Sequence, residues 1–204
     1  FFCPGMVTDA TPTYDGPVDV DRGRRGEATS FPNLNPYGSY SNVVVLTEEH
    51  YVPIDEFTVD QFADGLALAL EYVTAAFEAD ETARFGSINM NFLRPAGSSI
   101  IHPHMQTLAD RAGTNRQVAR TAAARAYHEA EGSTYWADLL DAERDGERHV
   151  GTTGDVTWIA PFAPKHHRHV RGILPDAGIP DPEDDLVRDV AEGLTNVLAA
   201  YGAL

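Results

Sequence analysis

The stretch Ser98-Ser99-Ile100-Ile101-His102-Pro103-His104-Met105-Gln106 decides how the rest of the chain is interpreted. It places a histidine on either side of a proline and a glutamine two residues further on. An imidazole with an ordinary pKa of about 6.5 is largely free base near neutral pH, so it can attack phosphorus. A covalent phospho-histidine divides one difficult displacement into two easier ones. Two other interpretations of this His-x-His pair remain open: half-buried histidines on a strand, or part of a metal site.

The composition predicts a folded, soluble protein with a strongly acidic surface. The chain has 204 residues, of which 43% are hydrophobic, and this is enough for a substantial core. No run of about 18 apolar residues occurs, so we expect no membrane span. The 31 acidic and 15 basic residues give a formal charge of −16, which repels nucleic acid and anionic membranes. A polyanionic substrate therefore requires a local basic or metal-bearing pocket.

Lysine and cysteine usage suggests where the protein works. Lys165 is the one lysine in the sequence, and an acid-rich, lysine-poor surface suits a cytosol of very high salt, where repulsion is screened. A halophilic source is thus one hypothesis, and a charge-rich protein of a dilute-salt organism is the other. Cys3 is the single cysteine, so no internal disulfide can form, as expected of a cytosolic enzyme. Phe1-Phe2-Cys3-Pro4 lacks the features of a signal peptide and an initiator methionine, which predicts that the sequence begins inside a longer protein.

Hydrophobic periodicity predicts a series of strands and helices. Residues 41–47 form a β-branched run bounded by turns, which indicates a buried strand. Thr58-Val59-Asp60-Gln61 has the form of a capping box, and apolar residues follow it at helical spacing as far as Phe77. Residues 3–30 are rich in turn formers and predict a long loop with at most one short strand. The other expected elements are strands at 84–93, 100–108 and 169–174, a hairpin of 148–153 with 156–162, helices at 115–131 and 134–144, and a last helix that begins at Asp181-Pro182-Glu183 and reaches Tyr201.

The order of these elements suggests an internal repeat. A strand at 43–47 precedes the helix at 59–77, and strand segments within 156–174 precede the helix at 183–201. This similarity predicts two related halves, of which the second is cut short. We place the first at residues 1–146 and the partial second at residues 147–204.

Further motifs are spaced around the His-Pro-His-x-Gln core. They are Phe2-Cys3-Pro4-Gly5, Phe31-Pro32-Asn33 with Pro36, the run from Val43 to His50, Asn91, Gly97, Ser99 and the run from Trp158 to Pro164. In these motifs the chain resembles the galactose-1-phosphate uridylyltransferase family, the nucleotidyltransferase branch of the histidine-triad (HIT) superfamily. The resemblance implies an α+β fold, with a HIT-like antiparallel sheet that has helices on one face, followed by the start of a second HIT-like repeat.

The resemblance also implies an activity and a set of site residues. The expected enzyme moves a nucleoside monophosphate, most simply UMP, between a nucleotide sugar and a hexose 1-phosphate through a nucleotidyl-histidine. His104 is the expected nucleophile, and Gln106 is expected to bond the phosphoryl oxygens of the intermediate. Ser99 and Asn91 are expected to hold the diphosphate, Asn33 lies in the nucleotide-binding turn, and Gly97 is expected to let the backbone come close to the ligand. A homodimer is also expected.

A structural zinc site is a further expectation from the resemblance. Its ligands would be Cys3, His50 and His102, and the fourth position falls one residue before Phe1, outside this sequence. A thiolate with imidazoles suits tetrahedral zinc. Residues i and i+2 of a strand share a face, so His102 and His104 can serve different partners only if Pro103 lies at a bend or bulge.

Two other functions stay open from the sequence. The first is a nucleotide-sugar or dinucleotide phosphorylase, or an adenylyltransferase of the same superfamily, which would differ in its acceptor or base. The second is a non-catalytic, nucleotide-binding HIT-like module. Met105 stands where the family usually has a small residue, which suggests a more crowded nucleophile and leaves room for this module. Arg120 stands near the place where some members have a carboxylate that binds a further metal.

Overall fold

A computed structural model describes residues 1–14, 16–18, 20, 22–174 and 178–203 of the chain. In these ranges antiparallel strands are mixed with helices, so the expected α+β class is confirmed. The elements in chain order are α1 (Pro4–Ala10), β1 (Arg24–Arg25), β2 (Ala28–Pro32), β3 (Tyr40–Val45), α2 (Val59–Ala79), β4 (Phe85–Asn89), the 3₁₀ turn η1 (Arg94–Ala96), β5 (His104–Asp110), α3 (Asn115–Glu131), α4 (Tyr135–Glu143), β6 (His149–Thr153), β7 (Val156–Ile159), β8 (Arg171–Ile173) and α5 (Asp185–Gly202).

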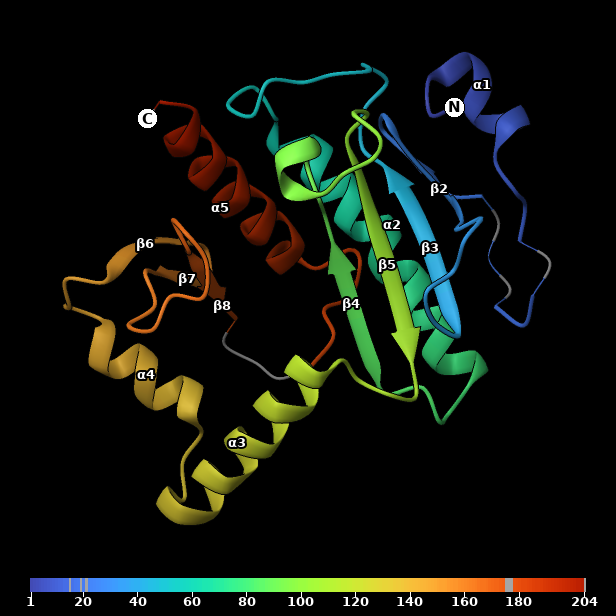
Figure 1. The fold of residues 1–204 in the computed structure, drawn as a ribbon. Helices are drawn as coiled ribbons and strands as arrows, with labels where there is room; N and C mark the ends of the chain where they lie inside the picture. Colours follow the sequence, from blue (N-terminus) through green and yellow to red (C-terminus); the bar gives the residue numbers. More distant parts are fainter. Residues whose placement is uncertain (15, 19, 21, 175–177, 204) are drawn as a thin grey trace.

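A five-stranded antiparallel sheet carries the His-Pro-His stretch. Its strand order is β1-β2-β3-β5-β4, so β5 lies between β3 and β4 (Figure 1). The register pairs His104 with Val45 and Gln106 with Val43. Along β5 the buried residues alternate with His104, Gln106 and Leu108, which are only half-buried. The nucleophile candidate and its glutamine therefore share one face of a central strand.

Helix α2 covers the opposite face of this sheet. Thr58 accepts a hydrogen bond from the backbone N–H of Gln61, and the Gln61 side chain accepts one from the Thr58 N–H, so the expected capping box is present. The buried side of α2, with Phe62 and Leu68, packs on Val44 and Met105 of the sheet. Helix α5 lies beside α2 (Figure 1), and its Leu194 and Leu198 pack against the core on this side of the sheet.

A second, smaller sheet follows in the chain. Strands β6, β7 and β8 are antiparallel neighbours in that order, and the expected hairpin turns at Gly154 and Asp155. Helix α5 contacts β6 and β7 as well as α2, so it joins the two sheets, while α3 and α4 form the covalent link between them (Figure 1). The division of the chain at residue 146 stays a prediction.

Several sequence-based expectations for secondary structure were wrong in detail, and the strand expected at 84–93 ends at Asn89. Residues 3–30 were expected to be a loop, yet they contain α1, β1 and β2, because Val7 packs with Phe31 of β2 in a small core. The strand expected at 100–108 begins only at His104, because Pro103 has no N–H to donate to a ladder. Helix α5 is capped by Asp184, whose carboxylate accepts from the Leu186 N–H, and not by Asp181.

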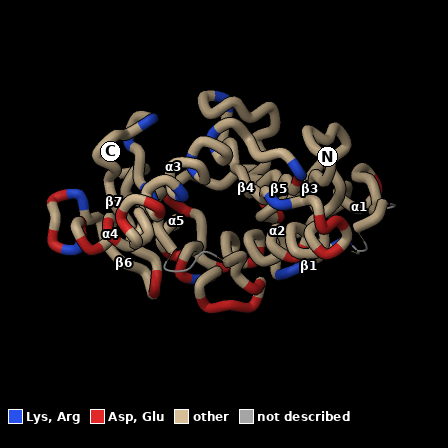
Figure 2. Tube along the Cα trace, turned by 90° about the horizontal axis from the view of Figure 1, so that it is seen from below, with Lys and Arg blue, Asp and Glu red and all other residues tan. Residues whose placement is uncertain are grey.

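Acidic residues are spread over both sheet units, with few basic positions among them (Figure 2). Helix α3 is an exception, because Arg116, Arg120 and Arg125 all lie on it. Among the helices of the described ranges, none combines the length and the apolar character needed to cross a bilayer.

Candidate functional site

Two adjoining cavities meet at His104. One has a volume of about 260 Å³ and lies between the β5 face, the turn around Asn33 and the N-terminal residues. The other has a volume of about 250 Å³ and is lined by the loop from Asn89 to Ser99. Tyr37, Ser99, His104 and Gln106 line both cavities. All six residues predicted for catalysis and substrate binding line one or both, and these are Asn33, Asn91, Gly97, Ser99, His104 and Gln106.

The ring of His104 is oriented by a backbone hydrogen bond. Its Nδ1 lies 2.8 Å from the carbonyl oxygen of His102. A carbonyl only accepts, so Nδ1 carries the proton and Nε2 keeps its lone pair. Burial lowers the pKa of His104 from its ordinary value, against the opposing effect of this hydrogen bond. The ring is therefore mostly neutral at pH 7, with Nε2 as its nucleophilic nitrogen.

His102 is completely buried and lies just before the strand. The carbonyl of Pro103 accepts the Leu46 N–H at 3.0 Å, and β5 starts at the next residue. Because His102 is outside the pleated strand, it is free of the rule that residues i and i+2 share a face. Its Nε2–H donates to the Thr47 carbonyl oxygen at 2.7 Å, which leaves Nδ1 unprotonated. Because His102 lies before the strand, the imidazoles of His102 and His104 can face different partners.

Cys3, His50 and His102 come together into a potential metal site. The Cys3 Sγ lies 3.5 Å from Nδ1 of His50 and 4.0 Å from Nδ1 of His102. The three donor atoms all fall within 4.8 Å of one another. Ligands of tetrahedral zinc at bond lengths of about 2.0 to 2.3 Å lie at comparable separations. Burial lowers the pKa of His102, which keeps it neutral as a ligand must be, and its Thr47 hydrogen bond fixes the tautomer. The residues present fit a zinc ion.

The residue beside Cys3 forms a wall of the nucleophile cavity. The ring of Phe2 packs edge-on against the ring of His104 with centroids 5.4 Å apart, and it also contacts Phe31 at 5.4 Å. Phe2 is 9% exposed. From the sequence, Phe2 was recognised only as part of a motif, and its contact with His104 was not predicted because an aromatic residue beside a cysteine has no distinctive spacing. The metal-site segment and the His104 pocket are therefore physically joined.

Gln106, Ser99 and Asn91 supply polar groups to the cavities. In the part of the chain that the structure describes, none of their side chains hydrogen-bonds another protein group. The neighbouring Ser98 differs, because it is buried and its hydroxyl donates to the Ile100 carbonyl at 2.6 Å. The side chains of Ser99, Asn91 and Gln106 are thus available to a ligand.

Gly97 and Asn33 hold their places for different reasons. Gly97 has a φ of +88°, a conformation that glycine adopts without strain, while a Cβ there would meet no atom within 4 Å. The positive φ of Gly97 therefore explains the glycine at this position, because no neighbouring atom would crowd a larger side chain. Asn33 accepts the Asn35 N–H at its Oδ1, and its Nδ2 is buried with no partner among the described residues. A buried amide donor that lines a cavity and lacks a partner favours a ligand at that point.

Two more residues bear on the site. Tyr37 lines both cavities and is 82% exposed, and it was not predicted as a site residue because only its place in an aromatic turn distinguishes it. Met105 was expected to crowd the nucleophile, yet it is 3% exposed and packs in the core on the α2 side of the sheet. Its side chain leaves the His104 face clear.

The chain is similar to several proteins of known sequence or structure. No protein-family model matches it. An uncharacterized protein from Archaeoglobus fulgidus is 37% identical over 201 residues, which make up 98% of this chain and 60% of that protein. An Arabidopsis thaliana ADP-glucose phosphorylase solved with bound ADP-glucose is 18% identical with a TM-score of 0.71, over 84% of this chain and 59% of that one. A uridylyltransferase is 21% identical with a TM-score of 0.73, over 85% and 62%.

A galactose-1-phosphate uridylyltransferase-like protein from Arabidopsis thaliana matches in the same way. It is 17% identical with a TM-score of 0.71, over 84% of this chain and 60% of that one. The chain thus spans about 60% of the length of the proteins that it matches. This protein therefore shares its fold with the galactose-1-phosphate uridylyltransferase-like proteins, as the His-Pro-His motifs predicted.

Proposed function

We propose that the protein is a nucleotidyltransferase that moves a nucleoside monophosphate, in the first instance UMP, between a nucleotide sugar and a hexose 1-phosphate. The observation that carries this proposal is the position of His104, whose ring is oriented by the His102 carbonyl oxygen at the junction of two cavities that also hold Ser99 and Gln106. Solved structures with this fold include a uridylyltransferase and an ADP-glucose phosphorylase. The phosphorylase was solved with bound ADP-glucose, which makes nucleotide sugars the first compounds to test.

The proposed chemistry has two balanced steps. In the first, the lone pair of His104 Nε2 attacks the α-phosphorus of the nucleotide sugar, and the bond from phosphorus to the bridging oxygen breaks. The sugar 1-phosphate leaves with the electron pair, and a nucleotidyl-histidine remains. In the second step an oxygen of another sugar 1-phosphate attacks the same phosphorus and releases the imidazole. The carbonyl of His102 stabilises the ring through Nδ1–H while charge develops on it.

Neutral donors complete the proposed site. Gln106 shares the strand face of His104 and would bond the phosphoryl oxygens, where charge grows in the transition state. Ser99 and Asn91 would hold the diphosphate, the backbone at Gly97 would line its binding loop, and Asn33 would meet the nucleotide. Zinc bound by Cys3, His50 and His102 would be structural, tying the N-terminal segment to the sheet.

Mass spectrometry of the intact protein tests the covalent step. The purified protein is incubated in high salt with UDP-glucose and, separately, with ADP-glucose, and is quenched in alkali, where phospho-histidine survives. We expect the mass of one nucleoside monophosphate on the peptide that holds His104, and the donor that labels identifies the base. His104→Ala should abolish labelling, and Gln106→Ala should slow it by about 10²- to 10³-fold. His128→Ala, at an exposed position outside the cavities, is the matched control. Labelling that is unchanged in His104→Ala would end the assignment.

The acceptor separates the proposed transferase from its alternatives. A phosphorylase would release the nucleotide from His104 to inorganic phosphate, so labelled protein is chased with phosphate or with galactose 1-phosphate in parallel. Faster loss of the label to the sugar phosphate supports the transferase, and faster loss to phosphate supports the phosphorylase named among the similar structures. A folded protein that binds nucleotide without ever being labelled would instead be a non-catalytic module.

Assembly and location are also part of the proposal. We infer a homodimer from the resemblance to the family, which light scattering of the purified protein tests directly. The single cysteine is consistent with a cytosolic enzyme. If the protein is monomeric and is still labelled on His104, the proposed dimer is wrong and the proposed covalent step is unaffected.

A further inference from the structure

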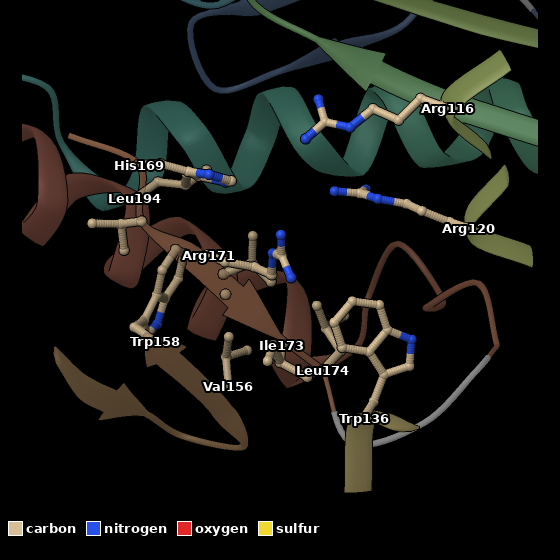
Figure 3. A pocket seen from close by; sticks show the side chains of 13 residues that line it. Arg116, Arg120, Trp136, Val156, Trp158, His169, Arg171, Ile173, Leu174 and Leu194 are labelled. Carbon is tan, nitrogen blue, oxygen red and sulfur yellow. The ribbon is translucent and has the colours of Figure 1, made fainter. Parts of the chain in front are cut away.

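A larger cavity lies in the second sheet unit, away from His104. Its volume is about 660 Å³, and it is open on one side and lined by residues of α3, α4, β7, β8 and α5 (Figure 3). It shares no lining residue with the two cavities at His104. The size is ample for a small organic ligand. This cavity is therefore separate from the proposed site of the transfer reaction.

Three guanidinium groups face this cavity. Arg116 and Arg120 stand one turn apart on α3, and Arg171 reaches in from β8, with the nitrogen ends of all three directed toward the same space (Figure 3). None of the lining residues is acidic. Within the described ranges, no carboxylate lies within 4 Å of any of the three arginines. The protein as a whole has a formal charge of −16, so three arginines without a carboxylate partner among the described residues form an unusual positive patch.

Such a cluster is unfavourable without an anion. Like charges at positions i and i+4 of a helix destabilise it, and Arg116 and Arg120 stand at this spacing. Burial lowers the pKa of Arg120, and repulsion from Arg116 and Arg171 adds to the effect. Burial also lowers the pKa of His169 at the cavity edge, again with Arg171 among the causes. A bound anion would remove this mutual repulsion.

The walls of the cavity hold one of the arginines in place. The guanidinium carbon of Arg171 lies 5.5 Å from the ring centroid of Trp136, a cation–π contact. The floor is apolar and well buried, with Val156 at 0%, Ile173 at 5% and Trp158 at 7% exposure. The Trp158 N–H is already used by Thr153 at 2.8 Å. The cavity thus has positively charged arginines at its edge and an apolar, buried floor.

We propose that this cavity binds a phosphate group, carried by inorganic phosphate or by a phosphate monoester of a small organic molecule. Planar guanidinium groups pair with phosphate oxygens through two parallel hydrogen bonds, and three of them converge here. The apolar base suits the carbon skeleton of a monoester. The site is distinct from the proposed transfer site and does not depend on it.

The two tryptophans of the chain provide the readout. Trp136 and Trp158 are the only tryptophans in the sequence, and both line this cavity. The protein is titrated at constant ionic strength with inorganic phosphate, with glucose 1-phosphate and with glucose, while tryptophan emission is followed and binding heat is measured in parallel. We expect a saturable response to both phosphate compounds and none to glucose. A tighter response to glucose 1-phosphate identifies the monoester, and a tighter response to phosphate identifies the free ion.

Matched variants assign the binding to the arginines. Arg120→Ala should weaken binding about tenfold or more, because a hydrogen bond to a charged group is lost, and Arg120→Lys should retain part of the affinity. Arg125→Ala is the control, since Arg125 is exposed on the same helix and does not line the cavity. His104→Ala should bind phosphate as the parent does, which separates this site from the proposed reaction. The proposal is overturned if neither phosphate compound gives emission change or heat, if glucose binds equally, or if Arg125→Ala loses as much affinity as Arg120→Ala.

Discussion

His102 connects two functions through different atoms of one residue. Its ring nitrogen Nδ1 faces Cys3 and His50, and its backbone carbonyl accepts the Nδ1–H of His104. The Nε2–H is held by Thr47, so the ring cannot easily rotate away from the metal ligands. Any shift of His102 therefore moves the group that orients the proposed nucleophile.

A first prediction concerns the metal ligands. Cys3→Ser should lower the zinc content of the purified protein and its thermal unfolding temperature, because a thiolate ligand is lost and the N-terminal segment is released from the sheet. Metal analysis by inductively coupled plasma mass spectrometry and a thermal melt measure the two effects. His128→Ala, away from the cluster, should change neither. A parent protein expressed with ample zinc that carries none would contradict the site.

A second prediction concerns Asp110, which anchors the loop that bears Tyr37. Its carboxylate accepts the Ser39 N–H at 2.9 Å and the Ala112 N–H at 3.3 Å, and the Ser39 bond is the main cause that lowers the pKa of Asp110. A carboxyl whose pKa falls on folding stabilises the native state above its unfolded pKa of about 3.9, and this contribution disappears as the pH falls through the folded value.

Asp110→Asn should therefore reduce stability at pH 7 and flatten the loss of stability below about pH 4. Chemical denaturation at a series of pH values measures both effects. Asp145→Asn, at an exposed turn position, is the matched control. If Asp110→Asn followed the same pH curve as the parent, the carboxylate would have no such role.

At the scale of elements, the contact of α2 with the sheet depends on a small residue. A Cβ at Gly65 would lie 2.1 Å from Cδ2 of Leu46, which is itself fully buried. Helical glycine normally costs about 1 kcal/mol relative to alanine, so its presence here reflects close packing. The spacing of α2 from β3 and β5 is thus set by this position.

The third prediction follows from that contact. Gly65→Ala should destabilise the protein by about 1 to 3 kcal/mol, because overpacking outweighs the gain in helix propensity. Urea denaturation measures the change. Gly5→Ala in α1 is the matched control, since a Cβ there meets nothing within 4 Å, and it should be neutral or slightly stabilising. A stabilised Gly65→Ala variant would show that α2 can move away from the sheet without cost.

Elements with strong local signals were predictable, and those made by distant contacts were not. The capping box at Thr58 and the apolar spacing behind it fixed α2 to within two residues at its C-terminus. Helix α1 is seven residues long with a glycine at its second position, and its packing of Val7 on Phe31 depends on a strand that comes later in the chain. The start of α5 was misplaced because Asp181 and Asp184 both resemble caps, and only the turn between them selects Asp184.

The same distinction holds for the site. Six residues that line the two cavities were named from motifs, namely Asn33, Asn91, Gly97, Ser99, His104 and Gln106, and Cys3, His50 and His102 were named as a set. The roles of Phe2 and Tyr37 were not, because a wall residue has no fixed sequence spacing. The cavity of Arg116, Arg120 and Arg171 was also missed, since 51 residues separate Arg120 from Arg171 and only the fold brings them together.

At the scale of the whole molecule, the excess of acidic residues predicts a response to salt. The formal charge of −16 produces self-repulsion that salt screens. If the protein is adapted to high salt, raising KCl from 0.1 M to 2 M should increase its unfolding temperature by on the order of 5 °C or more, which is a gain of one to a few kcal/mol. Potassium chloride is used because sulfate stabilises most proteins by exclusion. If the unfolding temperature is the same with and without added KCl, the high-salt hypothesis is wrong and the protein is a charge-rich protein of a dilute-salt organism.

Helix α5 joins the two sheets, and this arrangement has a consequence for the order in which the chain folds during synthesis. Leu194 and Leu198 of α5 pack onto the core that α2 and the first sheet share. About a hundred residues separate the end of α2 from the start of α5, so a ribosome that adds 5–20 residues per second needs about 5 to 20 seconds between them. During that interval the outer side of α2 remains an exposed apolar surface on the nascent chain. We therefore expect ribosome-bound intermediates that end before α5 to bind chaperones, and those that include it to be released.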